Sequence, residues 1–435
     1  MTYYSLNHNA PEATFEDAVV RGLAPDKGLY FPKTIQQLPD SFFQSIEKLN
    51  HIDIAFEAIK QFVGNEIPEK DLKAILKEVI NFDFPLVEIE KNIASLELYH
   101  GPTMAFKDVG ARFMARCLGF FNNKNHNKDT ITVLVATSGD TGGAVASGFL
   151  GVEGVDVVIL YPSGKVSDIQ EKQLTTLGQN ITALEVDGVF DDCQAMVKTA
   201  FLDEDLKTAK TLTSANSINI ARWLPQMFYY FFAYKALKDK NKKLVFSVPS
   251  GNYGNICAGM MAQKLGLPIH HFVTGTNANN IVPDYLKTGI YKTKASVSTI
   301  SNAMDVGDPS NFIRIEELHN NSFKQLKENL SGYSYTDSET IDAINYLKTH
   351  HNYVADPHGA IGYLALKNYI ITYPDSFYGI FLETAHPIKF LPVMPKEIAE
   401  QMKTPSQIKS ILHKEKKSIK VSNYNQLKHF LSNNA

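Results

Sequence analysis

The lysine at position 107 is the residue in this chain best placed to act as a nucleophile. It lies in the segment His100-Gly-Pro-Thr-Met-Ala-Phe-Lys-Asp108, between an apolar run at 96–99 and a helical pattern at 109–120. Apolar neighbours at such a strand-to-helix switch would desolvate the ammonium group and favour the neutral amine. A neutral lysine amine attacks carbonyl groups and forms Schiff bases. The alternative is a surface lysine at a helix start, since lysine is seldom buried unpaired.

A glycine-rich loop, Thr137-Ser-Gly-Asp-Thr-Gly-Gly143, follows a strand pattern and opens a helix. Glycines allow the backbone to approach a ligand, and the free N–H groups of a helix N-terminus bind anions. Ser138 and Thr141 add hydroxyl groups, so the loop could hold a carboxylate. A tight turn with Asp140 as the helix N-cap explains the same residues equally well.

A second loop, Val248-Pro-Ser-Gly-Asn-Tyr-Gly-Asn255, also lies between a strand pattern and a helix pattern. Its serine, asparagines and glycines offer successive side-chain and backbone donors to a phosphate group. Neither GxxxxGK[ST] nor GxGxxG is present, so a nucleotide pyrophosphate is the weaker interpretation.

Two polar segments complete the set of candidate binding residues. In Leu382-Glu-Thr-Ala-His-Pro-Ile-Lys-Phe390, the hydroxyl of Thr384 ends a strand and could bond an aromatic nitrogen without charging it. Helix capping is the alternative there. In Ser214-Ala-Asn-Ser-Ile-Asn-Ile-Ala-Arg222, the arginine could bind phosphate through two parallel hydrogen bonds. A capping cluster with a surface arginine is the competing interpretation. No HExxH, no GxSxG and no close histidine pair of metal-ligand type is present, so we expect no metal site.

Composition narrows the class of protein. The chain has 435 residues and a formal net charge of −3, which favours neither nucleic acid nor an anionic membrane as a partner. We see no secretory signal at the N-terminus and no apolar run near the ~20 residues of a membrane span. The three cysteines, Cys117, Cys193 and Cys257, form no CxxC pair and indicate buried thiols in a reducing, cytoplasmic compartment.

The patterns predict three regions. Residues 1–85 read as a small, mostly helical N-terminal domain, with helices at 14–22, 51–63 and 69–81. Residues 86–390 alternate strands and helices, which predicts an α/β region of two doubly wound lobes with mainly parallel sheets. The strand patterns are at 131–137, 155–161, 181–186, 244–248, 271–274 and 377–382. We place a smaller lobe at about 110–215, inserted in the larger one, and a helical extension at 391–435.

Taken together, the motifs resemble those of threonine synthases. HGPTMAFKD, ATSGDTGGAVA, residues 214–222, VPSGNYGN, SNAMD (301–305) and ETAHPIKF occur in that family's order and spacing. The resemblance covers nearly the whole chain and is to the form with an N-terminal domain. Each loop alone is a weak signal, but six in register are specific. Only about the last forty residues match loosely.

The resemblance implies a fold type II, tryptophan synthase β-like enzyme that depends on pyridoxal 5'-phosphate. Lys107 matches the family's Schiff-base lysine and is the expected catalytic residue. Thr384 matches the hydroxyl residue that faces the pyridine nitrogen. The expected phosphate cup of the cofactor consists of Ser250, Gly251, Asn252, Tyr253, Gly254 and Asn255.

The resemblance also implies substrate contacts. The expected carboxylate-binding loop consists of Thr137, Ser138, Gly139, Asp140 and Thr141. Many relatives in the superfamily have Asn where this chain has Asp140, which puts that residue's contact with the cofactor in question. Asn216, Ser217 and Arg222 match the site for the substrate phosphate.

The implied reaction converts O-phospho-L-homoserine and water into L-threonine and phosphate, the last step of threonine biosynthesis. A serine or threonine dehydratase of the same superfamily would share the lysine and the phosphate cup. A non-catalytic relative that binds a phosphorylated ligand is the alternative from another class. We expect a small-molecule substrate, no nucleic acid or membrane partner, and a monomer or homodimer.

Overall fold

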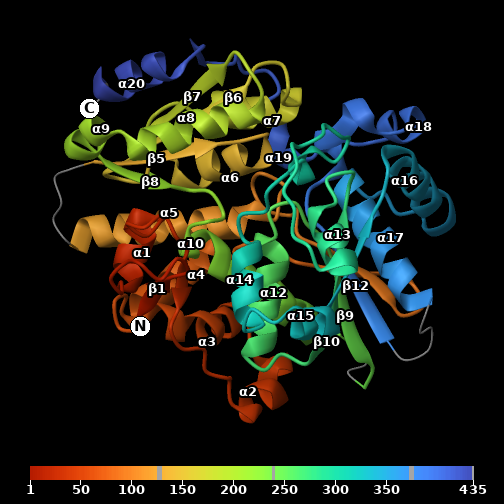
Figure 1. Cartoon of the computed structure of the whole chain (residues 1–435). Coiled ribbons are helices and arrows are strands. Elements are labelled where there is room, and N and C mark those ends of the chain that lie inside the picture. The colour runs from red at the N-terminus through yellow and green to blue at the C-terminus, as the bar shows by residue number, and fades with distance from the viewer. Residues whose placement is uncertain (125–129, 238–240, 372–376, 434–435) are drawn as a thin grey trace.

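Two parallel sheets organise the chain. The computed structural model describes residues 1–124, 130–237, 241–371 and 377–433. Within these residues, a six-stranded sheet has the order β11-β10-β9-β12-β4-β3, and a five-stranded sheet has the order β13-β7-β6-β5-β8. All pairs are parallel except β3 with β4. Figure 1 shows the five-stranded sheet above and the six-stranded sheet below and to the right.

The strands alternate with helices along most of the chain, as the sequence predicts for residues 86–390. The strands are β1 (Tyr3–Ser5), β2 (Tyr30–Pro32), β3 (Leu86–Glu90), β4 (Ile93–Glu97), β5 (Ile131–Ala136), β6 (Val155–Pro162), β7 (Ile181–Val186), β8 (Thr211–Ser214), β9 (Lys243–Pro249), β10 (Ile269–Thr276), β11 (Leu330–Ser334), β12 (Phe377–Glu383) and β13 (Ile419–Val421). The helices up to the middle of the chain are α1 (Phe15–Arg21), α2 (Asp40–Ser45), η1 (Ile46–Lys48), α3 (His51–Val63), α4 (Glu69–Val79), α5 (Lys107–Lys124), α6 (Asp140–Phe149), α7 (Asp168–Thr175), α8 (Phe190–Leu202), α9 (Glu204–Ala209), α10 (Ile220–Trp223), η2 (Leu224–Met227) and α11 (Phe228–Ala236). The later helices are α12 (Gly254–Lys264), α13 (Ile281–Thr288), η3 (Asn302–Met304), α14 (Phe312–Leu318), α15 (Phe323–Asn329), α16 (Asp337–His351), α17 (Pro357–Ile371), η4 (Pro387–Val393), α18 (Lys396–Ala399), α19 (Ser406–Lys409) and α20 (Tyr424–Asn433).

The five-stranded sheet is covered on both faces. Val133 and Val135 of β5 point toward a core shared with α5 and α6, whereas Leu134 points toward α8 and α20. Successive side chains of a strand face opposite sides, so a strand covered on both faces is apolar at nearly every position. Figure 1 shows α8 and α20 on one side of this sheet and α6 on the other.

The N-terminal region packs against both α/β parts. Helices α1 and α4 contact α5, and α3 contacts α11. Thr14 and Asp17 form a capping box at α1, and Asn50 caps α3, which explains where these helices begin. Besides the predicted helices, β1 and β2 pair in an antiparallel ribbon. The backbone carbonyl of Tyr30 in β2 accepts a hydrogen bond from Arg314, so this region also contacts α14.

The tail, predicted as a helical extension, also contains a strand. β13 pairs in parallel with β7 and ends the five-stranded sheet, and α20 then packs on α8. β13 has only three residues, which is too short for a strand pattern to be recognised in the sequence. It forms because the edge of β7 has unpaired backbone N–H and C=O groups. Within the basic run 413–417, Lys416 forms ion pairs with Asp168 and Glu171.

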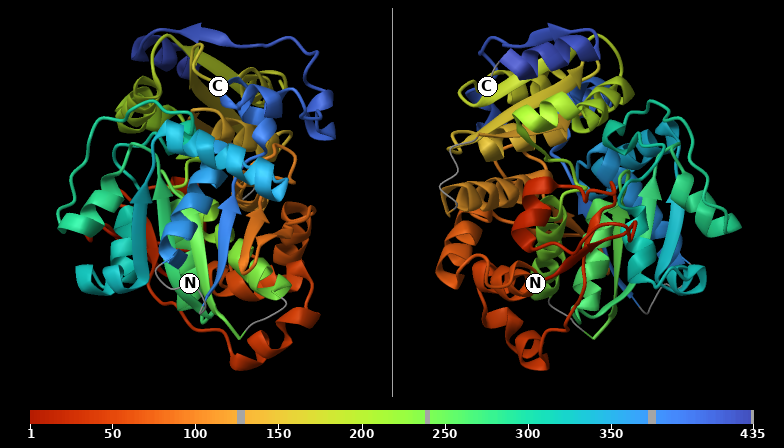
Figure 2. Two further views of the ribbon diagram at one scale, coloured as in Figure 1. Left: turned by 90° about the vertical axis from the view of Figure 1, so that its right-hand side faces the viewer. Right: turned by 60° about the vertical axis from the view of Figure 1, so that its left-hand side comes forward.

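The described part of the chain has no helix long and apolar enough to cross a membrane. Cys117, Cys193 and Cys257 are all buried free thiols, as predicted. The N-terminal segment lies in the lower half of the molecule, and α20 lies beside the five-stranded sheet at the top (Figure 2).

Candidate active site

A cavity of about 620 Å³ lies where the carboxyl ends of β5, β8, β9 and β12 meet. Ligands of doubly wound sheets bind at this edge, because the connecting loops and helix N-termini converge there. The predicted residues that line the cavity are Lys107, Thr137, Ser138, Thr141, Asn216, Ser217, Arg222, Gly251, Asn252, Tyr253, Gly254, Asn255 and Thr384. Gly139, Asp140 and Ser250 belong to the same loops but do not line it.

Lys107 is the first residue of α5 and is held against the end of β12. The Phe106 N–H donates to the backbone carbonyl of Thr384 at 2.8 Å, and the His386 N–H donates to that of Met104 at 3.1 Å. Met104 has a φ of 55°, a backbone conformation that costs free energy and occurs mostly where the surroundings require it. This short pairing brings Lys107 and Thr384 to one wall of the cavity.

The surroundings of Lys107 favour its neutral amine. Its side chain is only 16% exposed. Burial lowers the pKa of Lys107, and the cationic groups of Lys389 and Arg222 lower it further, while the Asp140 carboxylate opposes the shift. A lysine that loses its proton more readily is the form that condenses with a carbonyl group.

The loop at 250–255 joins β9 to α12 and turns its backbone toward the cavity. Tyr253, at the N-cap of α12, has a φ of 62°, in the left-handed region. The first N–H groups of α12 have no partner within the helix and are therefore available to an anion. Ser250 lies beneath the loop, where its hydroxyl donates to the Asn255 Oδ1 atom at 3.1 Å. Ser250 therefore supports the loop from within.

The loop at 137–143 is shaped by Thr137 and Gly139. Thr137 Oγ1 accepts hydrogen bonds from the N–H groups of Gly139 (2.9 Å) and Gly142 (2.8 Å). Gly139 has a φ of 137°, and a Cβ there would lie 2.7 Å from the Gln170 side chain. Only glycine suits both conditions. Ser138 and Thr141 are left facing the cavity.

Asp140, predicted to contact the substrate, pairs with Lys389 and does not line the cavity. Its carboxylate is 4% exposed and forms an ion pair with Lys389, with Oδ1 and Nζ 2.5 Å apart. Gln170 Nε2 also donates to Oδ1 at 2.9 Å. Burial alone would raise the pKa of Asp140, but the two lysines and the hydrogen bonds hold it well below its usual range. The sequence pattern shows the loop but not the partner that turns this side chain away.

The segment at 214–222 approaches the loop at 250–255. Ser217 Oγ accepts a hydrogen bond from Asn252 Nδ2 at 3.2 Å, so the two predicted anion-binding segments adjoin. Arg222 is buried, and its Nη1 donates to the Ala215 carbonyl at 2.9 Å. Its Nε atom has no hydrogen-bond partner among the described residues. Burial lowers the pKa of Arg222 to about 10, so the group stays cationic at neutral pH.

The comparisons with known proteins identify the family. Residues 85–372 match the family of pyridoxal-phosphate dependent enzymes, and residues 2–79 match the threonine synthase N-terminus family. The chain is 45% identical over 409 residues to the threonine synthase of Haemophilus influenzae, with 94% of each chain covered. The chain belongs to the threonine synthase family.

Solved structures of threonine synthases confirm the predicted fold class and cofactor. The Escherichia coli structure superposes with a TM-score of 0.93 at 40% identity, covering 100% of both chains. The pyridoxal-phosphate-bound structure from Brucella melitensis gives a TM-score of 0.92 at 32% identity, covering 99% of both chains. Membership of the threonine synthase family makes the protein a pyridoxal-phosphate-dependent lyase of threonine biosynthesis.

The residues of this chain suit the family's cofactor. A buried lysine of lowered pKa, a loop of backbone N–H groups and a strand-end hydroxyl all line one cavity. They correspond in type to an aldehyde partner, a phosphate cup and a partner for an aromatic nitrogen. Glu383, next to Thr384, is buried beside Asp356, and burial raises its pKa well above the usual value.

Three residues at or near the cavity were not among the predicted site residues. Arg314 donates to the backbone carbonyl of Ser217 at 3.2 Å. His358 lines the cavity and accepts the Ala303 N–H at 3.2 Å. Lys389 bonds Asp140. His358 and Lys389 lie in motifs visible in the sequence, at 356–359 and 382–390, whereas Arg314 carries no local signal.

Proposed function

We propose that this protein converts O-phospho-L-homoserine and water into L-threonine and inorganic phosphate. The observation that supports this most directly is that one cavity contains Lys107 and two adjoining anion-binding segments, at 250–255 and 214–222. One segment is needed for the cofactor's phosphate and another for the substrate's. A dehydratase of the same superfamily acts on substrates without a phosphate and needs only the first.

We assign the cofactor to Lys107, the loop at 250–255 and Thr384. When bound, pyridoxal phosphate withdraws electrons from the amino acid attached to it and so makes its Cα proton acidic. Lys107 joins the cofactor aldehyde, while the N–H groups of the loop hold the phosphate. Thr384 presents a hydroxyl, which can bond the pyridine nitrogen without protonating it.

The substrate is held at both of its anionic ends. Ser138 and Thr141 offer hydroxyl groups, and α6 offers its N-terminal amides, to the carboxylate. Asn216, Ser217 and Arg222 offer donors to the phosphate at the other end. Two fixed anion sites set the position of Cα relative to the lysine, which is the main contribution of the protein to such a reaction.

Lys107 also serves as the base. With the substrate bound to the cofactor, the free amine of Lys107 would remove the proton from Cα. A second proton leaves Cβ as the C–O bond to phosphate at Cγ breaks. Cγ then gains a proton, and water adds at Cβ with its oxygen becoming the threonine hydroxyl. Lys107 returns a proton to Cα, and the remaining proton goes to the released phosphate. The burial of Lys107 lowers its pKa, which favours the neutral amine that can accept a proton.

Product analysis tests the proposal. The purified protein, loaded with pyridoxal phosphate, is incubated with O-phospho-L-homoserine, L-serine or L-threonine, and phosphate, ammonia and L-threonine are quantified. We expect phosphate and L-threonine in equal amounts from the first substrate and little ammonia from the others. Ammonia release that exceeds phosphate release would instead identify a dehydratase.

We further infer that the enzyme works in the cytoplasm. Cys117, Cys193 and Cys257 are buried free thiols, as is usual in a reducing compartment. Burial raises the pKa of Cys117 and Cys257, which makes both thiols unreactive.

A further inference from the structure

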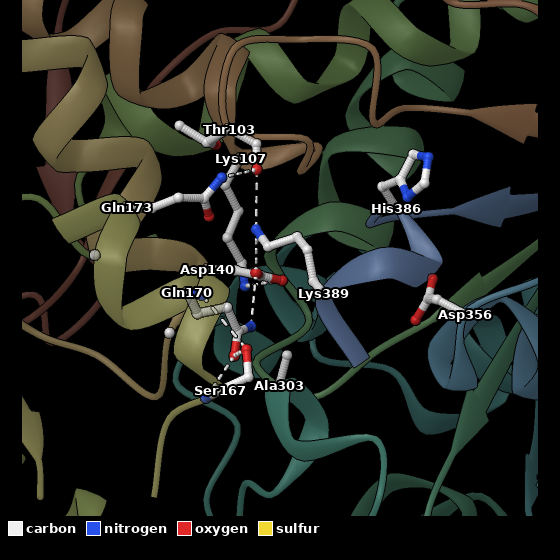
Figure 3. A network of polar contacts seen from close by, with 12 residues as sticks. Thr103, Lys107, Asp140, Ser167, Gln170, Gln173, Ala303, Asp356, His386 and Lys389 are labelled. Atoms are coloured by element: carbon white, nitrogen blue, oxygen red, sulfur yellow. Dashed lines mark hydrogen bonds and ion pairs between the residues drawn. The ribbon is translucent and has the colours of Figure 1, made fainter. Parts of the chain in front are cut away.

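Lys389 lies in η4 and is fully buried, which is rare for a lysine. Its Nζ atom is 2.5 Å from Asp140 Oδ1 and donates to the Thr103 carbonyl at 2.9 Å. The other carboxylate oxygen, Asp140 Oδ2, is 4.0 Å from the Nζ atom of Lys107. Figure 3 shows the Asp140 carboxylate between the ends of the two lysine side chains. One buried carboxylate therefore lies close to two amines, the fully buried one of Lys389 and the partly exposed one of Lys107.

We propose that Lys389 is a positioning residue, which pairs with Asp140 so that this carboxylate neither enters the substrate site nor holds Lys107 as an ammonium ion. The proposal rests on the role of Lys107 as the lysine that binds the cofactor. It goes beyond that role by assigning a function to a second lysine, which does not line the cavity.

The charges explain why a partner is needed at Asp140. A carboxylate 4.0 Å from an amine stabilises the protonated amine, and solvent screens such a pair poorly when both groups are buried. Asp140 is 4% exposed, so its attraction for a proton on Lys107 would be strong if it stood alone. The ammonium group of Lys389, closer to the carboxylate than Lys107 is, offsets that attraction.

The contacts around the pair keep it in one arrangement. Gln170 Nε2 donates to Asp140 Oδ1, and Ser167 Oγ donates to Gln170 Oε1 at 3.0 Å. On the other side, the Thr103 carbonyl that accepts from Lys389 also accepts from Gln173 Nε2 at 3.0 Å. The ion pair thus joins η4, α6 and α7 to the segment that leads into Lys107, as Figure 3 shows.

Other charged groups face Lys107 from different elements and would be unchanged by altering Lys389. Arg222 of α10 acts on Lys107 in the same direction as Lys389, and Asp356, at the start of α17, acts in the opposite direction. Asp108 follows Lys107 on α5, but its carboxylate accepts hydrogen bonds from the N–H and hydroxyl groups of Thr103. A change in Lys107 after substitution of Lys389 therefore reflects the loss of the Lys389 charge, and comparison with the Asp140→Asn and double variants separates the direct effect of that charge from its effect through Asp140.

A double-mutant cycle tests the proposal. The variants are Lys389→Met, Asp140→Asn and the double variant, with Lys396→Met as control, since Lys396 is 83% exposed and pairs only loosely with Glu400. The first readout is the pH dependence of acylation of Lys107 in the cofactor-free protein, followed by peptide mass spectrometry. The second is the pH titration of the visible absorbance of the loaded protein.

The charge argument predicts the direction for each variant. Lys389→Met leaves Asp140 unneutralised, so Lys107 should acquire a higher pKa and be labelled at least about tenfold more slowly at neutral pH. Asp140→Asn leaves Lys389 without a counter-charge, so Lys107 should acquire a lower pKa and be labelled faster. The double variant, which lacks both charges, should return toward the parent protein.

Two results would overturn the proposal: equal labelling of the Lys389→Met and Lys396→Met variants, or a double variant that stays as far from the parent as Lys389→Met. If Lys389→Met does not fold, the Asp140→Asn variant is used instead. Unchanged or slower labelling of Lys107 in that variant would refute the proposal. Neither readout uses substrate. A loaded protein that forms the Schiff base but releases no phosphate would refute the proposed substrate and leave this inference standing.

Discussion

Gly251 packs directly against the backbone of Met304. A Cβ atom on Gly251 would lie 2.6 Å from Met304 Cα and 2.9 Å from the Ala303 carbonyl oxygen. Both are main-chain atoms, which cannot rotate away as a flexible side chain can. His358 holds the same segment by accepting the Ala303 N–H. The contact therefore sets the spacing between the loop assigned to the cofactor phosphate and the segment at 301–305.

Gly251→Ala should weaken cofactor binding about tenfold or more, because forcing extra atoms into a packed site costs about 1–3 kcal/mol. The measurement is the dissociation constant for pyridoxal phosphate, from an absorbance titration of the cofactor-free protein. Gly164→Ala is the control: a Cβ atom at Gly164 would lie in open space, although the φ of 66° there, unlike the backbone at Gly251, is itself unfavourable for alanine. Equal losses in both variants would mean that the effect is only the general cost of replacing a glycine.

Lys107→Ala should abolish both threonine formation and the visible absorbance of the Schiff base, because no other amine is assigned to bind the cofactor. Lys107→Arg keeps the positive charge but should be equally inactive, since a guanidinium group is not deprotonated in proteins. The measurements are the absorbance spectrum and phosphate release. A coloured, active Lys107→Ala protein would refute the assignment.

Arg222→Gln should lower kcat/KM for O-phospho-L-homoserine by about 10- to 100-fold, because hydrogen bonds to charged groups contribute about 1.5–3 kcal/mol. The loss should fall on the phosphorylated substrate, while the affinity for pyridoxal phosphate stays near that of the parent. Steady-state kinetics and a cofactor titration separate the two effects. An unchanged kcat/KM would remove Arg222 from the substrate site.

Arg314→Met should destabilise the fold by more than about 3 kcal/mol, because several buried acceptors would lose their donor. Arg314 donates to the carbonyls of Tyr30 (3.0 Å), Ile218 (2.7 Å) and Ser217 (3.2 Å), and its guanidinium lies 4.3 Å from the centre of the Trp223 ring. Denaturant unfolding measures the change. Arg21→Met is the matched control, since Arg21 is 49% exposed and pairs with Asp17 on the surface. Similar losses in both variants would contradict the prediction.

His271 should make the protein less stable in mild acid. Burial, with a smaller effect of His270, lowers the pKa of His271 from 6.5 to about 4. Between these values the unfolded chain binds a proton that the folded chain does not, so stability falls as pH falls, by up to about 1.4 kcal/mol per pH unit. His271→Gln should flatten this part of the curve of unfolding free energy against pH. Substitution of the exposed His413 by Gln should leave the slope unchanged, and a flattened slope there too would argue against His271 as its source.

Local patterns in the sequence predicted much of the fold. The helix at 51–63 and the strand at 181–186 have the predicted bounds, and other predicted elements differ by a few residues at their ends. These segments are long or strongly patterned, and their caps and turns are encoded next to them. Short edge elements such as β13 were missed, because their pairing depends on a neighbouring strand far away in the sequence.

The sequence by itself determined which residues carry the chemistry: a lysine at a strand-to-helix switch and loops rich in glycine and hydroxyl groups at strand ends. The conformation of such loops depends on local backbone preferences, so the residue types and their spacing in the sequence are enough to predict them. Only the tertiary structure decided how they meet. The hydrogen bond from Phe106 to Thr384 and the ion pair of Asp140 with Lys389 join segments that are far apart along the chain. The burial that makes the Lys107 amine reactive is likewise produced by many distant residues at once, and no local pattern specifies it.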